Sequence, residues 1–221
     1  MFLSYKALIF DIDGTLADNF SVCVKAYQET LERHVGRPFS SEEIIGLFGK
    51  SDEGILSVYL TPERLEAVLD EYFETYERIQ RSECPQPFPG LKDTIQRLRA
   101  RGVAIGVVTG KSLRGSEITL RVLGLRQYID VLEAGFAAGP NKPESLRRAL
   151  CRLGLQAHEA VYVGDAAYDM EAAAAIGMPA VGAAWTATST IRNGAGATAL
   201  HIFHRIEDFH RWVDSAFAGR G

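Results

Sequence analysis

A short apolar strand that ends in two aspartates constrains the fold of this chain more than any other feature. Residues 7–10 are apolar, and Asp11 and Asp13 follow directly. A half-exposed strand would alternate apolar with polar residues, so this run indicates a strand covered on both faces, as in a parallel sheet. Side chains two residues apart in a strand point to the same face, so both carboxylates face one space. Their repulsion predicts a positive partner from elsewhere in the chain.

The second half of the sequence alternates helical and strand patterns. We expect helices at 91–101, about 113–123, 143–153 and 167–176, and strands at 103–109, 129–133, 160–165 and 179–182. Such alternation favours an α/β fold, a Rossmann-like doubly wound parallel sheet with helices on both faces. In such sheets the ligand crevice lies outside the carboxyl ends of the strands.

The region between the first strand and this alternation has helical spacing throughout. Apolar residues three and four apart predict helices at 17–34, about 40–48, about 52–59 and 62–81. Ser40 with Glu43 is typical of a capping box, and Thr61 before Pro62 of a helix start. The proline-rich stretch CPQPFPG, residues 84–90, predicts an extended return connector. We therefore expect a discontinuous α/β core, residues 1–15 and 88–221, with an all-helical insert at 16–87.

Composition excludes several classes of protein. The 221 residues are 47% hydrophobic and carry a net charge of -4, so nucleic acid is not expected as the main partner. The three cysteines, Cys23, Cys84 and Cys151, are widely spaced, which suggests reduced thiols with buried or half-buried side chains. The N-terminus enters the first strand at once and no apolar run approaches ~20 residues, so we expect a cytoplasmic protein without membrane insertion.

A threonine stands at the end of the second expected strand. The stretch VVTGKS, residues 107–112, is similar to the end of a phosphate-binding P-loop, but Ile105 stands where that pattern requires glycine. What remains is the Thr109 hydroxyl, followed by Gly110 and free backbone N–H groups at a helix start, which suit an anion. Alternatively, Thr109 only caps a turn.

A lysine and a second acid pair complete the set of candidate site residues. Lys142, in the loop GPNKPES, is either a solvated surface charge or the cation that offsets the first two acids. Asp165 and Asp169, in GDAAYD, are either a helix cap and a surface acid or further members of an acidic site. Oxygen ligands without histidine or cysteine favour Mg²⁺ over zinc or a redox metal.

Taken in order, DIDGT, the threonine of VVTGKS, the lysine of NKPES and GDAAYD resemble the four motifs of the haloacid dehalogenase superfamily. The resemblance is to the phosphoglycolate phosphatase and β-phosphoglucomutase-like branch, with the insert as its helical cap domain. Two positions depart from the family pattern: Gly110, where Asn or Ser is common, and Ala166, in place of a frequent Thr or Ser.

The resemblance implies a role for each motif residue. Asp11 would be the nucleophile that forms an aspartyl-phosphate, and Asp13 the general acid and then the base. Thr109, Gly110 and Lys142 would hold the phosphoryl group. Asp11, Asp13 through its backbone carbonyl, and Asp165 would ligate Mg²⁺, with Asp169 acting from behind them or through water.

The implied function is a Mg²⁺-dependent phosphatase for a small phosphorylated metabolite, with phosphoglycolate as first candidate. Asp13 separates the chain from the dehalogenases, which lack an aspartate there. The alternatives are a sugar-phosphate mutase, an inorganic pyrophosphatase, or a binding module of the same fold that has lost catalysis. We expect a monomer or a homodimer.

Substrate choice is expected to reside in the insert. The loop GLFGKSDEG, residues 46–54, resembles the specificity loop of the branch, with Lys50 and Ser51 as polar contacts to the substrate. Alternatively, it is an interhelix loop with a solvated lysine. Residues 15–18 and 84–89 would be hinges. His201, His204 and Glu207 are interpreted as polar positions on a terminal amphipathic helix rather than as a metal site.

Overall fold

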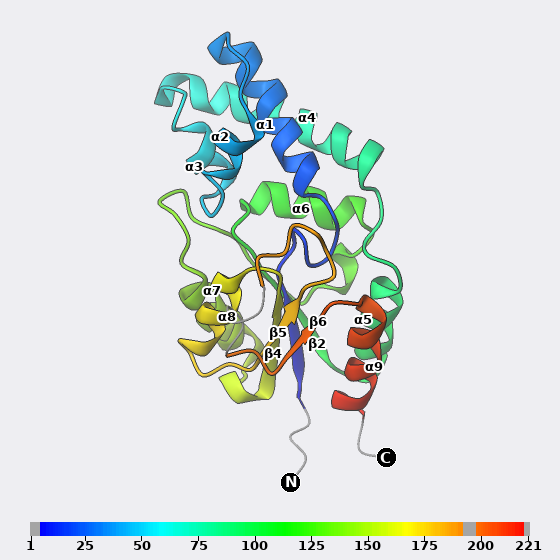
Figure 1. Cartoon of the computed structure of the whole chain (residues 1–221). Coiled ribbons are helices and arrows are strands. Elements are labelled where there is room, and N and C mark those ends of the chain that lie inside the picture. The colour runs from blue at the N-terminus through cyan, green and yellow to red at the C-terminus, as the bar shows by residue number, and fades with distance from the viewer. Residues whose placement is uncertain (1–4, 192–197, 219–221) are drawn as a thin grey trace.

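The central element of the molecule is a parallel sheet of six strands in the order β3-β2-β1-β4-β5-β6. The computed structural model describes residues 5–191 and 198–218. The sheet lies below a group of four helices, with both described ends of the chain on the far side (Figure 1). The strands are β1 (Ala7–Phe10), β2 (Ala104–Val108), β3 (Val131–Glu133), β4 (Ala160–Gly164), β5 (Ala180–Ala183) and β6 (His201–Phe203).

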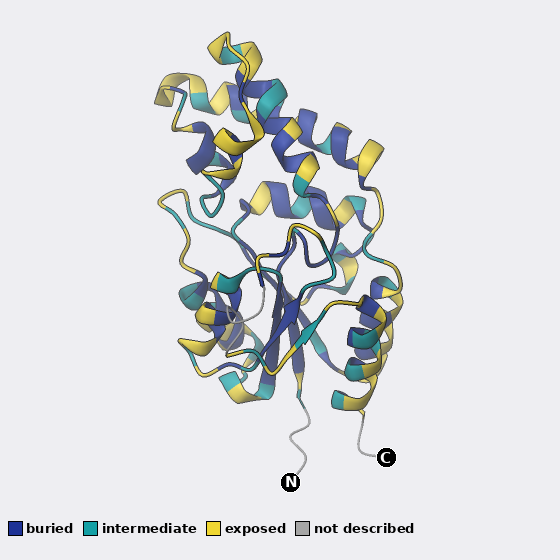
Figure 2. Cartoon of the chain, viewed as in Figure 1, coloured by how far each residue is buried: buried dark blue, intermediate teal, exposed yellow. Residues whose placement is uncertain are grey.

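The first strand is buried on both faces, as predicted. All four residues of β1 are 0% exposed, and Figure 2 shows the strands around it as buried. Leu8 and Phe10 pack into one apolar cluster, whereas Ala7 and Ile9 pack into another on the opposite face. Because β1 pairs in parallel with both β2 and β4, its carboxyl end lies between theirs.

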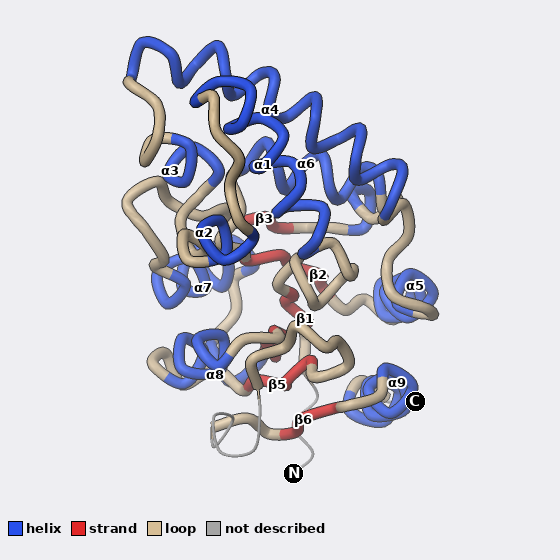
Figure 3. The backbone as a smooth tube through the Cα atoms, turned by 45° about the horizontal axis from the view of Figure 1, so that its top comes forward, coloured by secondary structure: helices blue, strands red, loops and turns tan. Residues whose placement is uncertain are grey.

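Helices cover both faces of this sheet. The core helices are α5 (Leu91–Ala100), α6 (Leu113–Val122), α7 (Lys142–Leu153), α8 (Ala167–Ala174) and α9 (Ile206–Ala216), with two short 3-10 turns at Arg126–Tyr128 and Ala157–Glu159. The helices α5 and α9 lie on one side and α7 and α8 on the other (Figure 3). This arrangement confirms the predicted α/β Rossmann-like fold.

The insert between β1 and α5 contains helices but no strand in residues 20–83. Its helices are α1 (Phe20–Val35), α2 (Ser41–Ile45), α3 (Asp52–Leu56) and α4 (Pro62–Glu83). The capping box of Ser40 and Glu43 is confirmed, whereas the Thr61 side chain makes no capping bond. The segments that enter and leave the insert lie side by side, because Phe88 N donates to Leu16 O at 2.9 Å. The domain boundaries at 15/16 and 87/88 stay a prediction.

Two expectations about single side chains were wrong. His201 lies in β6 and His204 in the turn after it, because α9 begins only at Ile206. A three-residue strand is too short to show a period, which is why the pattern favoured one longer helix. Cys151 is an exposed free thiol, while Cys23 and Cys84 are buried as expected. In the described ranges, none of the helices has the length and apolarity that a membrane span requires.

Phe209 should be a main anchor of α9 on the sheet, because it is 0% exposed and its ring centroid lies 6.4 Å from that of Phe10 and 5.2 Å from that of Trp185. We expect Phe209→Ala to lower the free energy of unfolding by about 3–5 kcal/mol, measured by urea denaturation. The exposed His204→Ala, as a control, should change it by less than about 0.5 kcal/mol. A loss below about 1 kcal/mol in Phe209→Ala would contradict this role.

Candidate active site

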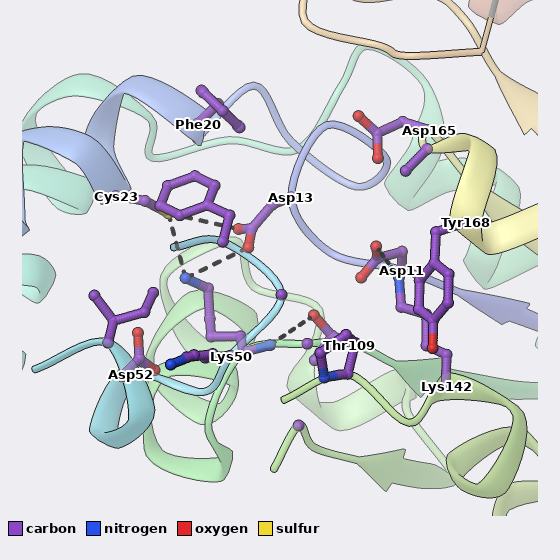
Figure 4. Close-up of a pocket in the computed structure, with 18 of the residues that line it drawn as sticks. Asp11, Asp13, Phe20, Cys23, Lys50, Asp52, Thr109, Lys142, Asp165 and Tyr168 are labelled. Atoms are coloured by element: carbon purple, nitrogen blue, oxygen red, sulfur yellow. Dashed lines mark hydrogen bonds and ion pairs between the residues drawn. The ribbon is translucent and has the colours of Figure 1, made fainter. Parts of the chain in front are cut away.

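The carboxyl ends of three neighbouring strands carry the candidate residues. Asp11 follows β1, Thr109 follows β2 and Asp165 follows β4. They line a cavity of about 380 Å³ between the sheet and the insert (Figure 4). Other lining residues are Asp13, Phe20, Cys23, Phe48, Lys50, Asp52, Gly110, Lys111, Lys142 and Tyr168. The structure therefore brings together every candidate residue of the core except Asp169, which lies directly behind the cavity against Lys142.

Lys142 is the positive partner of Asp11. Its Nζ donates to Asp11 Oδ2 at 2.6 Å and also to Asp169 Oδ1. The lysine is the first residue of α7 and is buried, so it is not the solvated surface charge of the alternative interpretation. Burial alone would lower the pKa of Lys142, but the charges of Asp11 and Asp169 outweigh it and raise that pKa well above its ordinary value.

Asp169 is fixed behind the cavity with an exposed fraction of 0%. Ala166 N donates to its Oδ2 at 3.0 Å, and the Tyr162 hydroxyl donates to its Oδ1 at 3.3 Å. The close approach of Asp169 to β4 requires Gly164, because a Cβ there would lie 2.3 Å from Asp169 Oδ2. Since α8 begins at Ala167 with Ala166 as its N-cap, Asp165 is not a helix cap and Asp169 is not a surface acid.

Three carboxylates form a group that suits a cation. Asp11, Asp165 and Asp169 each offer an oxygen atom within 4.8 Å of the others. In the described part of the chain, no hydrogen bond or ion pair reaches the Asp165 carboxylate, and burial together with the charges of Asp11 and Asp169 raises the pKa of Asp165 to about 8. The all-oxygen donor set fits Mg²⁺.

Gly14 makes the position of Asp165 possible. A Cβ at Gly14 would lie 2.3 Å from Asp165 Oδ2, and its φ of +72° lies in the left-handed region. The glycine of DIDGT thus leaves room for the Asp165 side chain against the loop that follows β1.

Asp13 has a different environment from Asp11, although both line the cavity. Asn19 Nδ2 donates to its Oδ1 at 2.6 Å, and Lys111 Nζ lies 3.5 Å from its Oδ2. Figure 4 shows Asp13 turned toward Cys23 and the insert, apart from Asp11 and Asp165. Burial raises the pKa of Asp13, and the charge of Lys111 opposes that shift. The Asp13 carboxylate is not in the three-carboxylate group; its predicted metal contact is the backbone carbonyl.

Sequence reasoning missed Lys111 as the partner of Asp13. The signal was present, since Lys111 is the lysine of VVTGKS, but the interpretation of that stretch assigned a role to Thr109 and Gly110 and none to the lysine. The Thr109 hydroxyl accepts a bond from Lys111 N at 3.3 Å, and Gly110 lines the cavity beside it. Ser112 is the N-cap of α6 and accepts a bond from Gly115 N at 3.1 Å.

The two candidates in the insert differ in their placement. Lys50 lines the cavity. The Ser51 hydroxyl caps α3 by accepting a bond from Gly54 N at 3.4 Å, and it donates to Glu53 at 2.6 Å. The next residue, Asp52, lines the cavity instead. The loop is held against the core because Ser51 N donates to Phe136 O at 3.1 Å.

The family model of haloacid dehalogenase-like hydrolases matches residues 8–183. The chain belongs to this family. A phosphoglycolate phosphatase of Xanthomonas campestris pv. campestris is 31% identical over 185 residues, which cover 81% of this chain and 83% of that protein. The pyrophosphatase PpaX of Bacillus pumilus is 29% identical over 183 residues, 82% of this chain and 84% of that one.

A solved structure shows the same fold. CbbY from Rhodobacter sphaeroides, in complex with phosphate, superimposes with a TM-score of 0.75 at 24% identity, over 90% of this chain and 93% of the other. The match to the family model and the curated relatives confirm the predicted family. They also confirm the prediction that the protein is an enzyme of the phosphatase type.

The raised pKa of Asp165 predicts how stability depends on pH in protein stripped of metal. Because the pKa in the folded state, about 8, exceeds the ordinary carboxyl value, the folded state keeps this proton longer. The contribution of Asp165 to the free energy of unfolding should be full below pH ~4 and should fall as pH rises toward 8. Urea denaturation with a chelator should show this fall in wild type relative to Asp165→Asn.

Mg²⁺ gives the matching control. Saturating Mg²⁺ should stabilise wild type, most at high pH, and should stabilise Asp165→Asn much less. A wild-type minus Asp165→Asn difference that is flat across pH would contradict the assignment.

Proposed function

We propose that this protein hydrolyses a small phosphomonoester through an aspartyl-phosphate on Asp11. The observation that carries the proposal is the pairing of Asp11 Oδ2 with Lys142 Nζ at 2.6 Å, at the end of the central strand and facing the cavity. The buried ammonium holds the Asp11 carboxylate at the cavity, where it can attack phosphorus. The same cation can neutralise a phosphoryl oxygen as charge develops on it.

The remaining core residues suit the other parts of the reaction. Asp13 would donate a proton to the leaving oxygen and then accept one from the attacking water, and burial, which raises its pKa, favours the protonated form needed first. Thr109 and the backbone of Gly110 would donate to the phosphoryl oxygens. Asp11, the Asp13 carbonyl and Asp165, backed by Asp169, would hold Mg²⁺, which supplies positive charge against the phosphoryl group.

The size and charge of the cavity favour a small leaving group with an anionic end. A cavity of about 380 Å³ is at the small end of ligand pockets. Three lysines line it in the described part of the chain, and Lys111 and Lys142 are held in ion pairs with acids. Lys50 makes no such ion pair with any residue that the structure describes, so it can receive a second anionic group. Phosphoglycolate, which ends in a carboxylate, is our first candidate substrate.

Pyrophosphate is the second candidate, because a relative named as a pyrophosphatase matches over 82% of this chain. A screen of small phosphorylated metabolites with Mg²⁺, including phosphoglycolate, pyrophosphate and sugar phosphates, tests the choice by release of inorganic phosphate. Isomerisation of a sugar phosphate without release would identify a mutase instead. Binding without turnover of any compound, generic aryl phosphates included, would identify a silent module.

Asp11→Asn should abolish turnover and the covalent phosphoenzyme, because an amide cannot act as the nucleophile. We expect loss of at least about 10³-fold in kcat, measured by phosphate release, with folding retained by circular dichroism. Asp18→Asn makes the same change at an exposed position between β1 and α1 and should keep activity within about twofold. Wild-type turnover in Asp11→Asn would refute the nucleophile assignment.

Lys50→Gln should separate substrates by the charge of their leaving groups. We expect kcat/KM for phosphoglycolate to fall about tenfold or more, while kcat/KM for an uncharged aryl phosphate stays within about twofold. Lys25→Gln removes an insert lysine that pairs with Glu83 on the surface and should leave both unchanged. Equal losses on both substrates in Lys50→Gln would exclude a contact with the anionic end.

A further inference from the structure

Asp52 is a buried carboxylate of the insert whose acceptor positions are all taken. It is 2% exposed. Its Oδ1 accepts from the Tyr27 hydroxyl at 2.5 Å and from the Tyr72 hydroxyl at 2.9 Å. Its Oδ2 accepts from Ser112 N at 3.1 Å and from the Ser112 hydroxyl. Four donors fill the carboxylate, so Asp52 lines the cavity without an acceptor left for substrate.

The four donors come from both sides of the interface between insert and core. Tyr27 and Tyr72 belong to α1 and α4 of the insert, whereas Ser112 is the N-cap of the core helix α6. A carboxylate is favoured at a helix N-terminus, where backbone N–H groups lack partners. Gly115, in the first turn of α6, leaves space for the Asp52 carboxylate, since a Cβ there would lie 2.5 Å from Asp52 Oδ2.

Lys111, the residue before Ser112, forms an ion pair with Asp13. The Lys111 side chain is 4% exposed, and its ammonium lies 3.5 Å from Asp13 Oδ2 and 3.3 Å from Cys23 Sγ. The same nitrogen lies 4.5 Å from the ring centroid of Tyr76, a residue of α4. Insert residues thus fix both the side chain of Lys111 and the backbone that follows it.

We propose that Asp52 is a positioning residue for Asp13. By docking on the N-terminus of α6, it fixes Ser112 and, through the adjoining peptide, the Lys111 ammonium that meets Asp13. Placement of the insert on the core and placement of the acid–base group are then one event. This inference rests on the proposed function, in which Asp13 transfers the proton.

Asp52→Asn tests the proposal with a matched control. The asparagine oxygen can still accept from the tyrosines, but its amide nitrogen cannot accept from Ser112. Asp70→Asn makes the same change in the same interface, because Asp70 of α4 pairs with Arg114 of α6, at a side chain that is 69% exposed. With an aryl phosphate we expect kcat to fall about ten- to hundredfold in Asp52→Asn with KM within about threefold, and Asp70→Asn to stay within about twofold of wild type.

A thiol probe reads the same cluster without activity. In a Cys84→Ser, Cys151→Ser background, Cys23 is the remaining cysteine of the chain. Burial raises the pKa of Cys23 to about 12, so labelling by a disulfide reagent should be slow. Asp52→Asn should speed it about tenfold or more, and Asp70→Asn should not. If Asp52→Asn does not fold, Ser112→Ala, which removes one of the four donors to Asp52, replaces it. This variant should also lower kcat and speed Cys23 labelling, each by a smaller factor.

The outcomes separate the two proposals. A wild type that hydrolyses no phosphomonoester defeats the proposed function, while Cys23 labelling still decides whether Asp52 fixes the Lys111 cluster. Asp52→Asn with unchanged kcat and slow labelling overturns the inference. Equal effects in Asp70→Asn also overturn it, because they would reflect general weakening of the interface.

Discussion

The site depends on the ion pairs that the buried ammonium of Lys142 makes with Asp11 and Asp169. Lys142 joins the end of β1, through Asp11, to α8, through Asp169, and it is itself the first residue of α7. Removing it would leave the buried carboxylates of Asp11 and Asp169 without their shared cation, which is far more costly than losing a surface ion pair. Lys142 pairs with two members of the three-carboxylate group, whereas no hydrogen bond or ion pair from the described residues reaches the carboxylate of the third, Asp165.

A second lysine divides the two acids of DIDGT into separate environments. Asp11 and its partner Lys142 lie wholly within the core, whereas Asp13 and Lys111 contact insert residues Asn19, Cys23 and Tyr76. The pair of Asp11 and Lys142 is therefore held by the α/β core. The placement of Asp13, in contrast, depends on how the insert packs on the core, because insert side chains contact both Asp13 and Lys111.

Local sequence patterns were enough to predict most of the fold and the carboxylates of the site. The doubly buried strand, the later alternation and the motif carboxylates are each visible in a few consecutive residues. Of the two counter-charges, Lys142 was a candidate from the sequence, whereas Lys111 was missed because its contact with Asp13 joins residues far apart in sequence. The sequence around Asp52 did not indicate a role for this residue. Its contacts depend on Tyr27, Tyr72 and Ser112, which are distant in sequence and close in space. Three-residue β6 was too short for any period.

The interrupted core also has a consequence for how the chain reaches this structure. Ala7 pairs with Ala104 and with Ala160, so the central strand is formed from partners very distant in sequence. Closing so long a segment costs chain entropy and slows folding. The Phe88–Leu16 hydrogen bond brings the two ends of the insert together. Once the insert is formed, the length of free chain between β1 and β2 is short, so the insert also lowers the entropic barrier to forming the central sheet.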